Sequence, residues 1–226
     1  MSLFGAIKQA LRRRRLSKLT PQEIFSDYAR TNKWGDDASL SGKGSNLEAT
    51  TKLRQILPEL LRELGATSML DLPCGDFFWM SHVDLNDIDY IGGDIVPDLI
   101  ATNQVMHSSS RRRFEVIDLI AGPIPAADVI FVRDCLVHLS NTHVEVALRN
   151  IAKSGGKWLL TTTFPNTAFN EDIVTGQWRA IDLTLAPFSL PMPERLVAEG
   201  QAFSKGQGEG KMLGLWSIDI LKERLS

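Results

Sequence analysis

The sequence predicts an α/β fold in which a mostly parallel sheet is covered by helices on both faces. Short apolar runs that end on acidic or small residues recur from residue 68 onward, and helical patterns fill the gaps between them. The 226 residues, 43% of them apolar, are enough for one substantial core. Strands that alternate with helices form parallel sheets through right-handed crossovers, and the ligand crevice of such a sheet lies at the carboxyl ends of its strands.

The first 22 residues form a strongly basic segment. They include six lysines and arginines, four of them in the run 12–15, and no acid. This segment therefore carries +6 and the remainder of the chain −8. We expect residues 1–22 to be a solvated, flexible terminus, although contact with phosphate or an anionic membrane, or an organelle transit peptide, fits the same composition. The acidic body argues against nucleic acid as a partner.

Residues 23–226 are expected to form one domain, which begins with helices. The stretch TPQE (20–23) is a capping box with proline at the first helical position and predicts a helix start. A glycine- and serine-rich loop follows at 39–45. Leucines and isoleucine at helical spacing over 53–64 predict the next helix, which Gly65 ends and Pro58 kinks or divides.

Five apolar runs then predict strands: SMLDL, YIGGDIV, RRFEVIDL, ADVIFVRD and KWLLTTTF. Between the last two, a second capping box at Thr142 and Glu145 predicts a helix. Residues from about 165 to 205 are rich in proline, asparagine, aspartate and aromatic residues, which predicts a long functional excursion over the carboxyl edge of the sheet. The run KMLGLWSIDIL predicts a closing strand.

Acidic residues end the first three of these strands. Asp71 ends the first, Gly75 follows in the turn, Asp94 ends the second and Asp118 the third. An acid about 20 residues beyond a glycine turn is placed to accept both ribose hydroxyls of an adenosine ligand. The structural alternative has Asp71 capping the next helix and Asp94 lying in a turn.

The turn after the first strand does not fit a dinucleotide. A pyrophosphate needs glycines for backbone approach, but the turn contains Pro73, Phe77, Phe78 and Met80. Asp76 would also place a negative charge beside the phosphates. A ligand with a positive centre and no phosphate fits better, and S-adenosylmethionine is such a ligand.

On these residues the chain resembles the class I S-adenosylmethionine-dependent methyltransferases. LDLPCGDF resembles their first motif, GGDIV the second-strand acid, FEVIDL the third-strand motif and VIFVRDCLVHLS the fourth strand with its helix. The resemblance covers roughly residues 35–165 and the final strand. It implies a Rossmann-like, seven-stranded, mostly parallel sheet with an antiparallel last strand, and S-adenosylmethionine as cofactor. Pro73 and Phe77 replace two of the family's three glycines, so Phe77 must turn away from the cofactor.

The resemblance also implies roles for individual residues. Asp71 and Gly75 would line the methionine tail, Asp94 would hold the ribose, Asp118 and Leu119 would bracket the adenine, and Asp134 would face the sulfonium and the substrate. Lys43, Gly44 and Ser45 could bind the tail carboxylate, as backbone amide nests bind anions, or form a plain connector. The predicted cofactor site also includes Pro73, Cys74, Asp76, Ile95 and Arg133.

Catalysis of methyl transfer to oxygen or nitrogen needs a base that removes a proton. The candidates are Asp134, His138 and Asp172, in that order, with a packed histidine as the alternative for His138. The polar cluster NEDIVTGQWR favours a polar small-molecule acceptor such as a sugar, or else is an ion-paired surface loop. The predicted substrate-binding residues are Trp79, Asn170, Trp178 and Arg179.

Other function classes remain as alternatives or are excluded. A non-catalytic protein of this fold that binds an adenosyl ligand or a partner is the second reading, and an NAD(P)-dependent oxidoreductase the third. Cys74 and Cys135 give no disulfide framework, which favours a reducing, cytoplasmic location, and we expect the two thiols to lie near the crevice. The local sequence offers too few ligands for a metal site, and no apolar run is long enough to span a bilayer.

Overall fold

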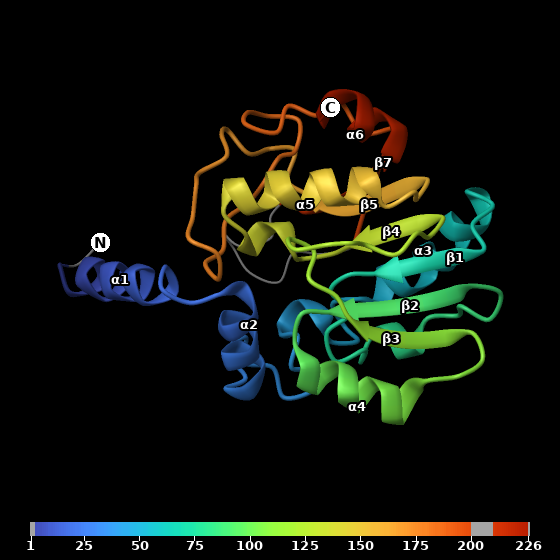
Figure 1. Cartoon of the computed structure of the whole chain (residues 1–226), viewed down its shortest axis with the longest axis horizontal. Helices are drawn as coiled ribbons and strands as arrows, with labels where there is room; N and C mark the ends of the chain where they lie inside the picture. Colours follow the sequence, from blue (N-terminus) through green and yellow to red (C-terminus); the bar gives the residue numbers. More distant parts are fainter. Residues whose placement is uncertain (1–2, 200–209, 226) are drawn as a thin grey trace.

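The computed structural model describes residues 3–199 and 210–225 and contains the predicted sheet. Its order is β3-β2-β1-β4-β5-β7-β6 (Figure 1). The strands β1 to β5 are mutually parallel, and β7 runs antiparallel to both β5 and β6. The strand bounds are β1 Ser68–Asp71, β2 Asp89–Asp94, β3 Arg112–Val116, β4 Val129–Val132, β5 Trp158–Thr163, β6 Arg195–Ala198 and β7 Met212–Ser217.

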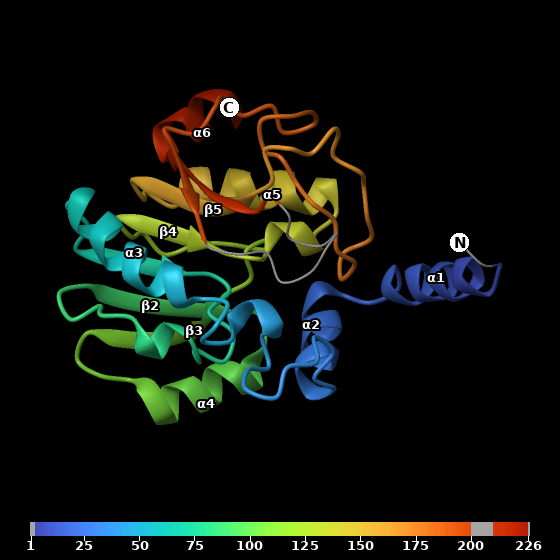
Figure 2. The same cartoon turned by 180° about the vertical axis from the view of Figure 1, so that it is seen from behind.

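Helices cover both faces of this sheet, as predicted. Successive residues of β1 point to opposite faces: Met69 packs in the apolar cluster with α3 and α4, and Leu70 packs in the cluster with α5 and α6. Figure 2 shows α3 on the face turned away in Figure 1. The helices are α1 Leu3–Leu16, α2 Pro21–Arg30, α3 Thr51–Glu63, α4 Pro97–His107, α5 Asn141–Lys153 and α6 Ile218–Leu225, with 3₁₀ turns η1 Lys43–Ser45, η2 Met80–His82 and η3 Leu136–His138.

Two of the predicted helix signals are confirmed. Thr20 caps α2, because the Glu23 amide donates to Thr20 Oγ1 at 3.2 Å and the Thr20 amide donates to Glu23 Oε2 at 2.7 Å. Gly65 follows the end of α3 with a φ of +60°, and the Ala66 amide donates to Leu61 O at 2.9 Å. Pro58, however, lies inside α3 without dividing it.

Other local predictions were wrong. The helix α5 is capped by Ser140, whose hydroxyl accepts from the His143 amide at 3.3 Å, so Thr142 lies within the helix and is not its cap. The third strand ends at Val116, two residues before Asp118. The closing run divides into β7 and α6 at residues 217–218. The strand β6 lies inside the excursion of residues 165–205, for which no strand was predicted; residues 200–205 of that excursion lie outside the described part of the chain.

The basic segment contains a helix in its described residues. The helix α1 projects from the body (Figures 1 and 2) and is anchored at its C-terminal end, where Leu16 packs with Ile24 and Tyr28. The Arg12 guanidinium donates to the Tyr28 hydroxyl at 3.0 Å and to Gly176 O at 3.3 Å. Among the residues that the structure describes, no helix is both long and apolar enough to cross a bilayer.

Candidate active site

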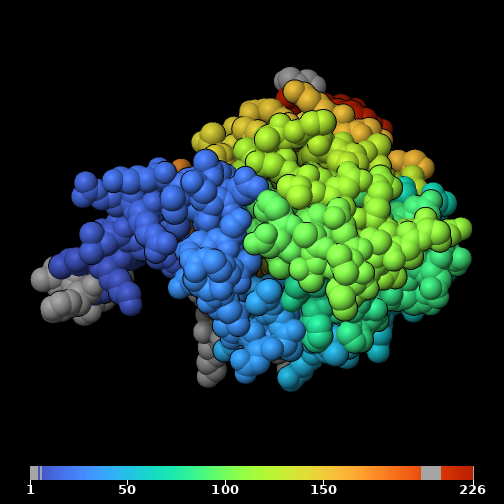
Figure 3. Space-filling model, turned by 60° about the horizontal axis from the view of Figure 1, so that its bottom comes forward, coloured from blue at the N-terminus to red at the C-terminus, as the bar shows by residue number. Residues whose placement is uncertain are grey.

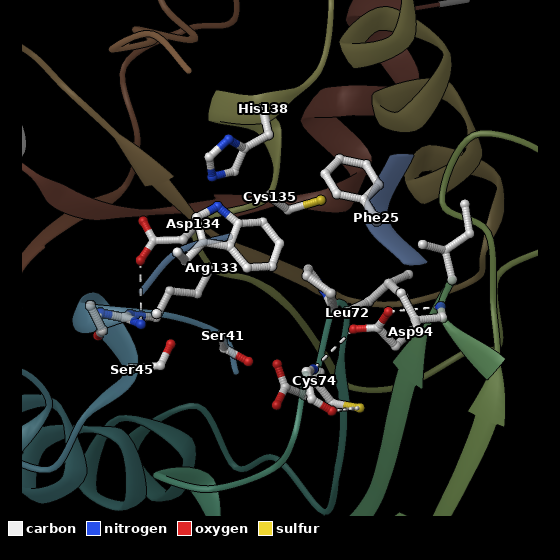
Figure 4. A pocket seen from close by; sticks show the side chains of 18 of the residues that line it. Phe25, Ser41, Ser45, Leu72, Cys74, Asp94, Arg133, Asp134, Cys135 and His138 are labelled. Atoms are coloured by element: carbon white, nitrogen blue, oxygen red, sulfur yellow. Dashed lines mark hydrogen bonds and ion pairs between the residues drawn. The ribbon is translucent and has the colours of Figure 1, made fainter. Parts of the chain in front are cut away.

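A cavity of about 500 Å³ lies at the carboxyl ends of β1, β2 and β4, where the strand order reverses. The helix α2 and the loop that leads to η1 close it from the other side (Figure 4). Most of the site residues predicted from the sequence contribute to its lining: Lys43, Gly44, Ser45, Asp71, Pro73, Cys74, Gly75, Trp79, Asp94, Ile95, Asp118, Leu119, Arg133, Asp134, His138 and Trp178.

The turn after β1 is tied to the end of β2 through Asp94. One carboxylate oxygen of Asp94 accepts from the Gly75 amide at 3.0 Å and the other accepts from the Val96 amide at 2.9 Å. Burial raises the pKa of Asp94 to about 6, although these amides oppose the shift. The Asp94 carboxyl is therefore fixed in position at the cavity wall.

Both the backbone conformation at position 75 and the nearby Ser41 side chain require glycine there. Its φ is +56°, and a Cβ there would lie 2.0 Å from Ser41 Oγ. Asp76 holds the same neighbouring loop: its carboxylate accepts from the Leu40 amide at 2.7 Å and from the Ser39 hydroxyl at 3.1 Å. Asp76 does not line the cavity, so its role in this structure is to seat the loop that does.

Phe77 turns away from the cavity, as the resemblance required. Its φ of +58° places the ring in the core, with its centroid 5.2 Å from that of Tyr90 and 5.1 Å from that of Phe114. Phe77 is only 1% exposed. The position keeps the left-handed backbone that a glycine would adopt, and its side chain contributes to the core.

Asp71, at the end of β1, is a buried acid with one strong hydrogen bond. Tyr90 donates its hydroxyl hydrogen to Asp71 Oδ2 at 2.7 Å. Burial raises the pKa of Asp71 to about 7, against the opposing effects of this hydrogen bond and of Arg133. Close to neutral pH the group can therefore change its charge beside the cavity.

Apolar side chains line the wall beyond β2 and β3. Ile95, Ile117 and Leu119 face the cavity there. Asp118 Oδ1 accepts hydrogen bonds from the Ile120 amide at 2.8 Å and from the Ala121 amide at 3.2 Å. These two bonds hold the loop in a tight turn. This wall suits a flat, weakly polar ring.

Four charged side chains form a network at the opposite end. Buried Arg133 donates through Nε to Glu199 Oε2 at 2.7 Å and through a terminal nitrogen to Gly44 O at 2.9 Å. Lys211 Nζ lies 2.6 Å from Asp134 Oδ2 and 3.1 Å from Glu199 Oε2. The guanidinium carbon of Arg133 also lies 5.4 Å from the centroid of the Trp79 ring. The network therefore joins η1, the ends of β4 and β6 and the residue before β7 around the cavity.

Asp134 remains ionised within this network. Burial alone would raise the pKa of Asp134, but Lys211 and Arg133 more than offset it and lower the value to about 2. Its φ is +52°, and its amide donates to Thr162 Oγ1 at 2.9 Å. A carboxylate of such low pKa is a weak base and a good fixed anion.

His138 has the better geometry for a base. Its Nδ1 lies 2.9 Å from Gln177 O, and a carbonyl only accepts hydrogen bonds, so Nδ1 carries the proton and Nε2 keeps a lone pair when the ring is neutral. Burial lowers the pKa of His138 below its usual 6.5. The His138 ring lies beside Trp34, with ring centroids 5.9 Å apart. Figure 4 shows His138 near Asp134 and Cys135 in the cavity lining.

Three residues predicted from the excursion do not reach the cavity. Asp172 accepts from the Asn141 amide at 2.8 Å at the start of α5. Asn170 holds a loop, with its amide nitrogen 2.8 Å from Asp182 O. Arg179 donates to Leu136 O at 2.8 Å. Each of these side chains has a hydrogen-bond partner within the protein: Asn170 satisfies a backbone carbonyl of the excursion, and Asp172 and Arg179 tie the excursion to α5 and η3.

Several lining residues were not predicted from the sequence. Phe25 of α2, Trp34 and Phe164 also line the cavity, and Phe164 packs edge to face against Trp178 with ring centroids 6.0 Å apart. Glu199 directly follows β6, and Lys211 directly precedes β7. Trp34, an aromatic residue in an otherwise polar stretch, was the one residue whose local sequence could have indicated a binding role. The sequence around Glu199 and Lys211 gave no such indication.

Both cysteines lie at the cavity. Cys74 and Cys135 are free thiols that both line the cavity, and burial raises the pKa of each. The described residues contain no group of three or more histidine, cysteine or acidic side chains that could hold a metal ion.

Solved structures share this architecture. Magnesium protoporphyrin IX methyltransferase from Synechocystis PCC 6803, solved with S-adenosylhomocysteine bound, matches with a TM-score of 0.61 at 13% identity, over 88% of this chain and 99% of that one. The N-methyltransferase NodS from Bradyrhizobium japonicum, also in complex with S-adenosylhomocysteine, matches with a TM-score of 0.57 at 17% identity, over 84% and 97%. The chain has the class I methyltransferase fold. The [4+2]-cyclase SpnF also matches, with a TM-score of 0.53 at 19% identity over 76% of this chain and 71% of that one, so the fold alone does not fix the reaction.

Searches against protein-family models and against curated protein sequences found no match.

Proposed function

We propose that the protein transfers a methyl group from S-adenosylmethionine to an oxygen or nitrogen nucleophile of a small-molecule acceptor. The observation that carries this proposal is the buried Asp94 carboxyl. It ends β2, is held by the Gly75 amide, and faces a cavity at the switch point of the sheet. Solved structures of the same fold are named as methyltransferases with S-adenosylhomocysteine or S-adenosylmethionine bound.

The lining of the cavity fits this cofactor. Among the described lining residues there are five carboxyl groups and three cationic side chains, which favours a ligand with a positive centre. Asp94 would hold the ribose, Ile95 and Leu119 would pack on the adenine, and Gly75 leaves room for close approach to the backbone. Lys43 lies near enough to the cavity to attract the tail carboxylate.

The segment after β1 weighs against NAD(P). A dinucleotide places its pyrophosphate at the N-terminus of the helix that follows the first strand. Here β1 leads into a turn and then the three-residue 3₁₀ turn η2. Because no long helix begins at that point, the oxidoreductase alternative lacks its binding element.

S-adenosylmethionine, when bound, would supply a methyl group activated by its sulfonium, which an acceptor nucleophile aligned opposite the sulfur would take while the thioether leaves. His138 Nε2 would accept the proton from an acceptor hydroxyl or ammonium, and ionised Asp134 would orient that group. The helix α2 and Trp34 cover the cavity and would exclude water. This assignment places His138 ahead of Asp134 as the base and leaves Asp172 without a role in proton transfer.

The cavity walls also bear on the acceptor. The polar cluster of residues 170–179 favoured a polar acceptor such as a sugar, but Asn170 and Arg179 of that cluster serve structural roles here. Phe25, Trp34 and Trp178 instead present aromatic surface to the cavity. We therefore propose an acceptor with a flat, apolar part and one hydroxyl or amino group, because aromatic rings pack well on such surfaces.

Calorimetry followed by a turnover assay tests the proposal. We expect S-adenosylmethionine and S-adenosylhomocysteine to bind and NADH not to bind. With methyl-labelled S-adenosylmethionine and a panel of phenols, aromatic amines and sugars, label should enter a phenol or amine. Binding without transfer to any acceptor would favour the non-catalytic alternative, and absence of binding would contradict the proposal.

A further inference from the structure

The helix α1 is an exposed, basic element that the proposed activity does not use. It stands out from the body as the blue projection at the left of Figure 3. Its C-terminal end is fixed by buried Leu16 and by the hydrogen bonds of Arg12 to Tyr28 and Gly176, so the helix has a defined origin on the body.

The outer face of α1 combines apolar and cationic side chains. Ile7 is 50% exposed and Leu11 is 62% exposed. Ile7, Leu11 and Arg14 are separated by four and three residues, so they lie on one face of the helix, and the exposed Lys8 and Arg13 flank it. Exposed leucine and isoleucine beside cations are the pattern of helices that lie in a membrane interface.

A cationic groove lies where α1 meets α2. It has a volume of about 400 Å³, and its lining includes Arg12, Arg15, Arg30, Lys33 and one carboxylate, Asp27. Asp27 pairs with Arg15 at 3.1 Å and with Arg30 at 2.5 Å. One carboxylate does not balance four cations, and the excess positive charge favours an anionic group in the groove.

We propose that α1 and this groove form a docking surface for an anionic lipid bilayer. Ile7 and Leu11 enter the headgroup region, Lys8, Arg13 and Arg14 face the lipid phosphates, and the groove receives a headgroup. The charge distribution favours an anionic bilayer as the partner, because residues 1–22 have a charge of +6 and the rest of the chain −8. An anionic surface attracts the helix and repels the body. The proposal does not depend on methyl transfer.

Vesicle cosedimentation of the full chain tests the docking surface. We expect the protein to sediment with phosphatidylcholine vesicles that contain phosphatidylglycerol, to stay in solution with phosphatidylcholine alone, and to be released by added salt. Each basic residue near an anionic surface contributes about 1 kcal/mol, so Arg13→Gln with Arg14→Gln should weaken the partition about thirtyfold. Ile7→Ser with Leu11→Ser should weaken it while leaving the charge unchanged.

Lys52→Gln with Lys153→Gln is the matched control, because it removes two exposed lysines from the body and should leave binding unchanged. Failure of the protein to bind anionic vesicles would overturn the proposal, as would equal binding by the Arg13/Arg14 variant. Binding of a single-stranded RNA oligonucleotide, with no binding to vesicles, would assign the surface to nucleic acid. Release from the vesicles by soluble glycerol phosphate at unchanged ionic strength would overturn bilayer docking and show that the surface binds a single phosphate group.

Discussion

The carboxylate of Asp94 accepts a hydrogen bond from the Gly75 amide at 3.0 Å. The acid that ends β2 is thereby joined to the turn that follows the neighbouring strand β1, beside the switch point between β1 and β4. Two of the residues on which the proposed cofactor site depends are thus one structural unit, and a change in either should alter the binding of the adenosyl ligand.

Asp94→Asn should weaken S-adenosylmethionine binding about ten- to a hundredfold, because hydrogen bonds to a charged group contribute roughly 1.5–3 kcal/mol. Asparagine keeps the size of the side chain and one acceptor oxygen, so the fold should survive. Calorimetric titration measures the change. Asp98→Asn, exposed in the first turn of α4, is the control. Equal affinity in the two variants would remove Asp94 from the site.

Gly75→Ala should also reduce cofactor affinity, because the added Cβ would lie 2.0 Å from Ser41 Oγ and push the loop of residues 39–45 from the cavity. Gly35→Ala is a matched control: its φ is +62°, and nothing lies within 4 Å of the added Cβ. Both variants carry the backbone strain, and only the first has the clash. Adding Ser41→Gly to Gly75→Ala should restore affinity; a lack of restoration would show that the backbone, and not the contact, is decisive.

Turnover should depend on pH through His138. Burial lowers the pKa of His138 below its usual 6.5, so the ring is neutral and able to accept a proton at pH 7. The rate should stay level near neutral pH and fall only as the pH drops through that lowered pKa. A rate that falls already between pH 8 and 7 would contradict this assignment.

His138→Gln should lower kcat about 10²- to 10⁴-fold and leave the dissociation constant of S-adenosylmethionine nearly unchanged. His82→Gln, an exposed histidine in η2, should change neither quantity. Equal losses of binding and turnover in His138→Gln would indicate that the ring supports the cavity wall and is not the base.

Stability should decrease as the pH rises, because of Asp71. Burial raises the pKa of Asp71 from 3.8 to about 7, so the folded protein holds this proton more tightly than the unfolded chain does. The stabilisation is complete below about pH 4 and is lost as the pH rises through about 7. Asp94, with its pKa raised to about 6, contributes in the same direction.

Asp71→Asn removes the ionisation and keeps an oxygen that accepts from Tyr90. Thermal unfolding at pH 8 should show this variant more stable than the original protein by on the order of 3 kcal/mol, with a smaller difference at pH 5. The exposed Asp87→Asn is the control and should follow the original protein at both values. A variant less stable than the original at pH 8 would show that Asp71 is ionised and paired in the fold.

The sequence predicted the part of the site that depends on strand ends. Asp71 and Asp94 follow short apolar runs, and the carboxyl ends of parallel strands meet at one edge, so their place at the cavity followed from local pattern. Phe77 was predicted to turn away because its bulk did not fit the cofactor, and its ring lies in the core.

The rest of the site depends on contacts between distant parts of the chain. Glu199 meets Arg133, and Lys211 meets Glu199 and Asp134, because β7 pairs antiparallel with both β5 and β6. Nothing in the local sequence of these strands indicates that pairing. Asn170 and Arg179 were predicted to bind substrate because polar residues cluster there. Asn170 instead satisfies a backbone carbonyl of the excursion itself, and Arg179 satisfies the Leu136 carbonyl of η3 and so ties the excursion to it.

A crystal structure with S-adenosylhomocysteine tests the central claim most directly. The account predicts that the ribose hydroxyls lie within hydrogen-bond distance of the Asp94 carboxylate, with the adenine against Ile95 and Leu119 and the sulfur facing Asp134 and His138. A nucleoside bound at another edge of the sheet, with Asp94 still turned only to the Gly75 and Val96 amides, would contradict it.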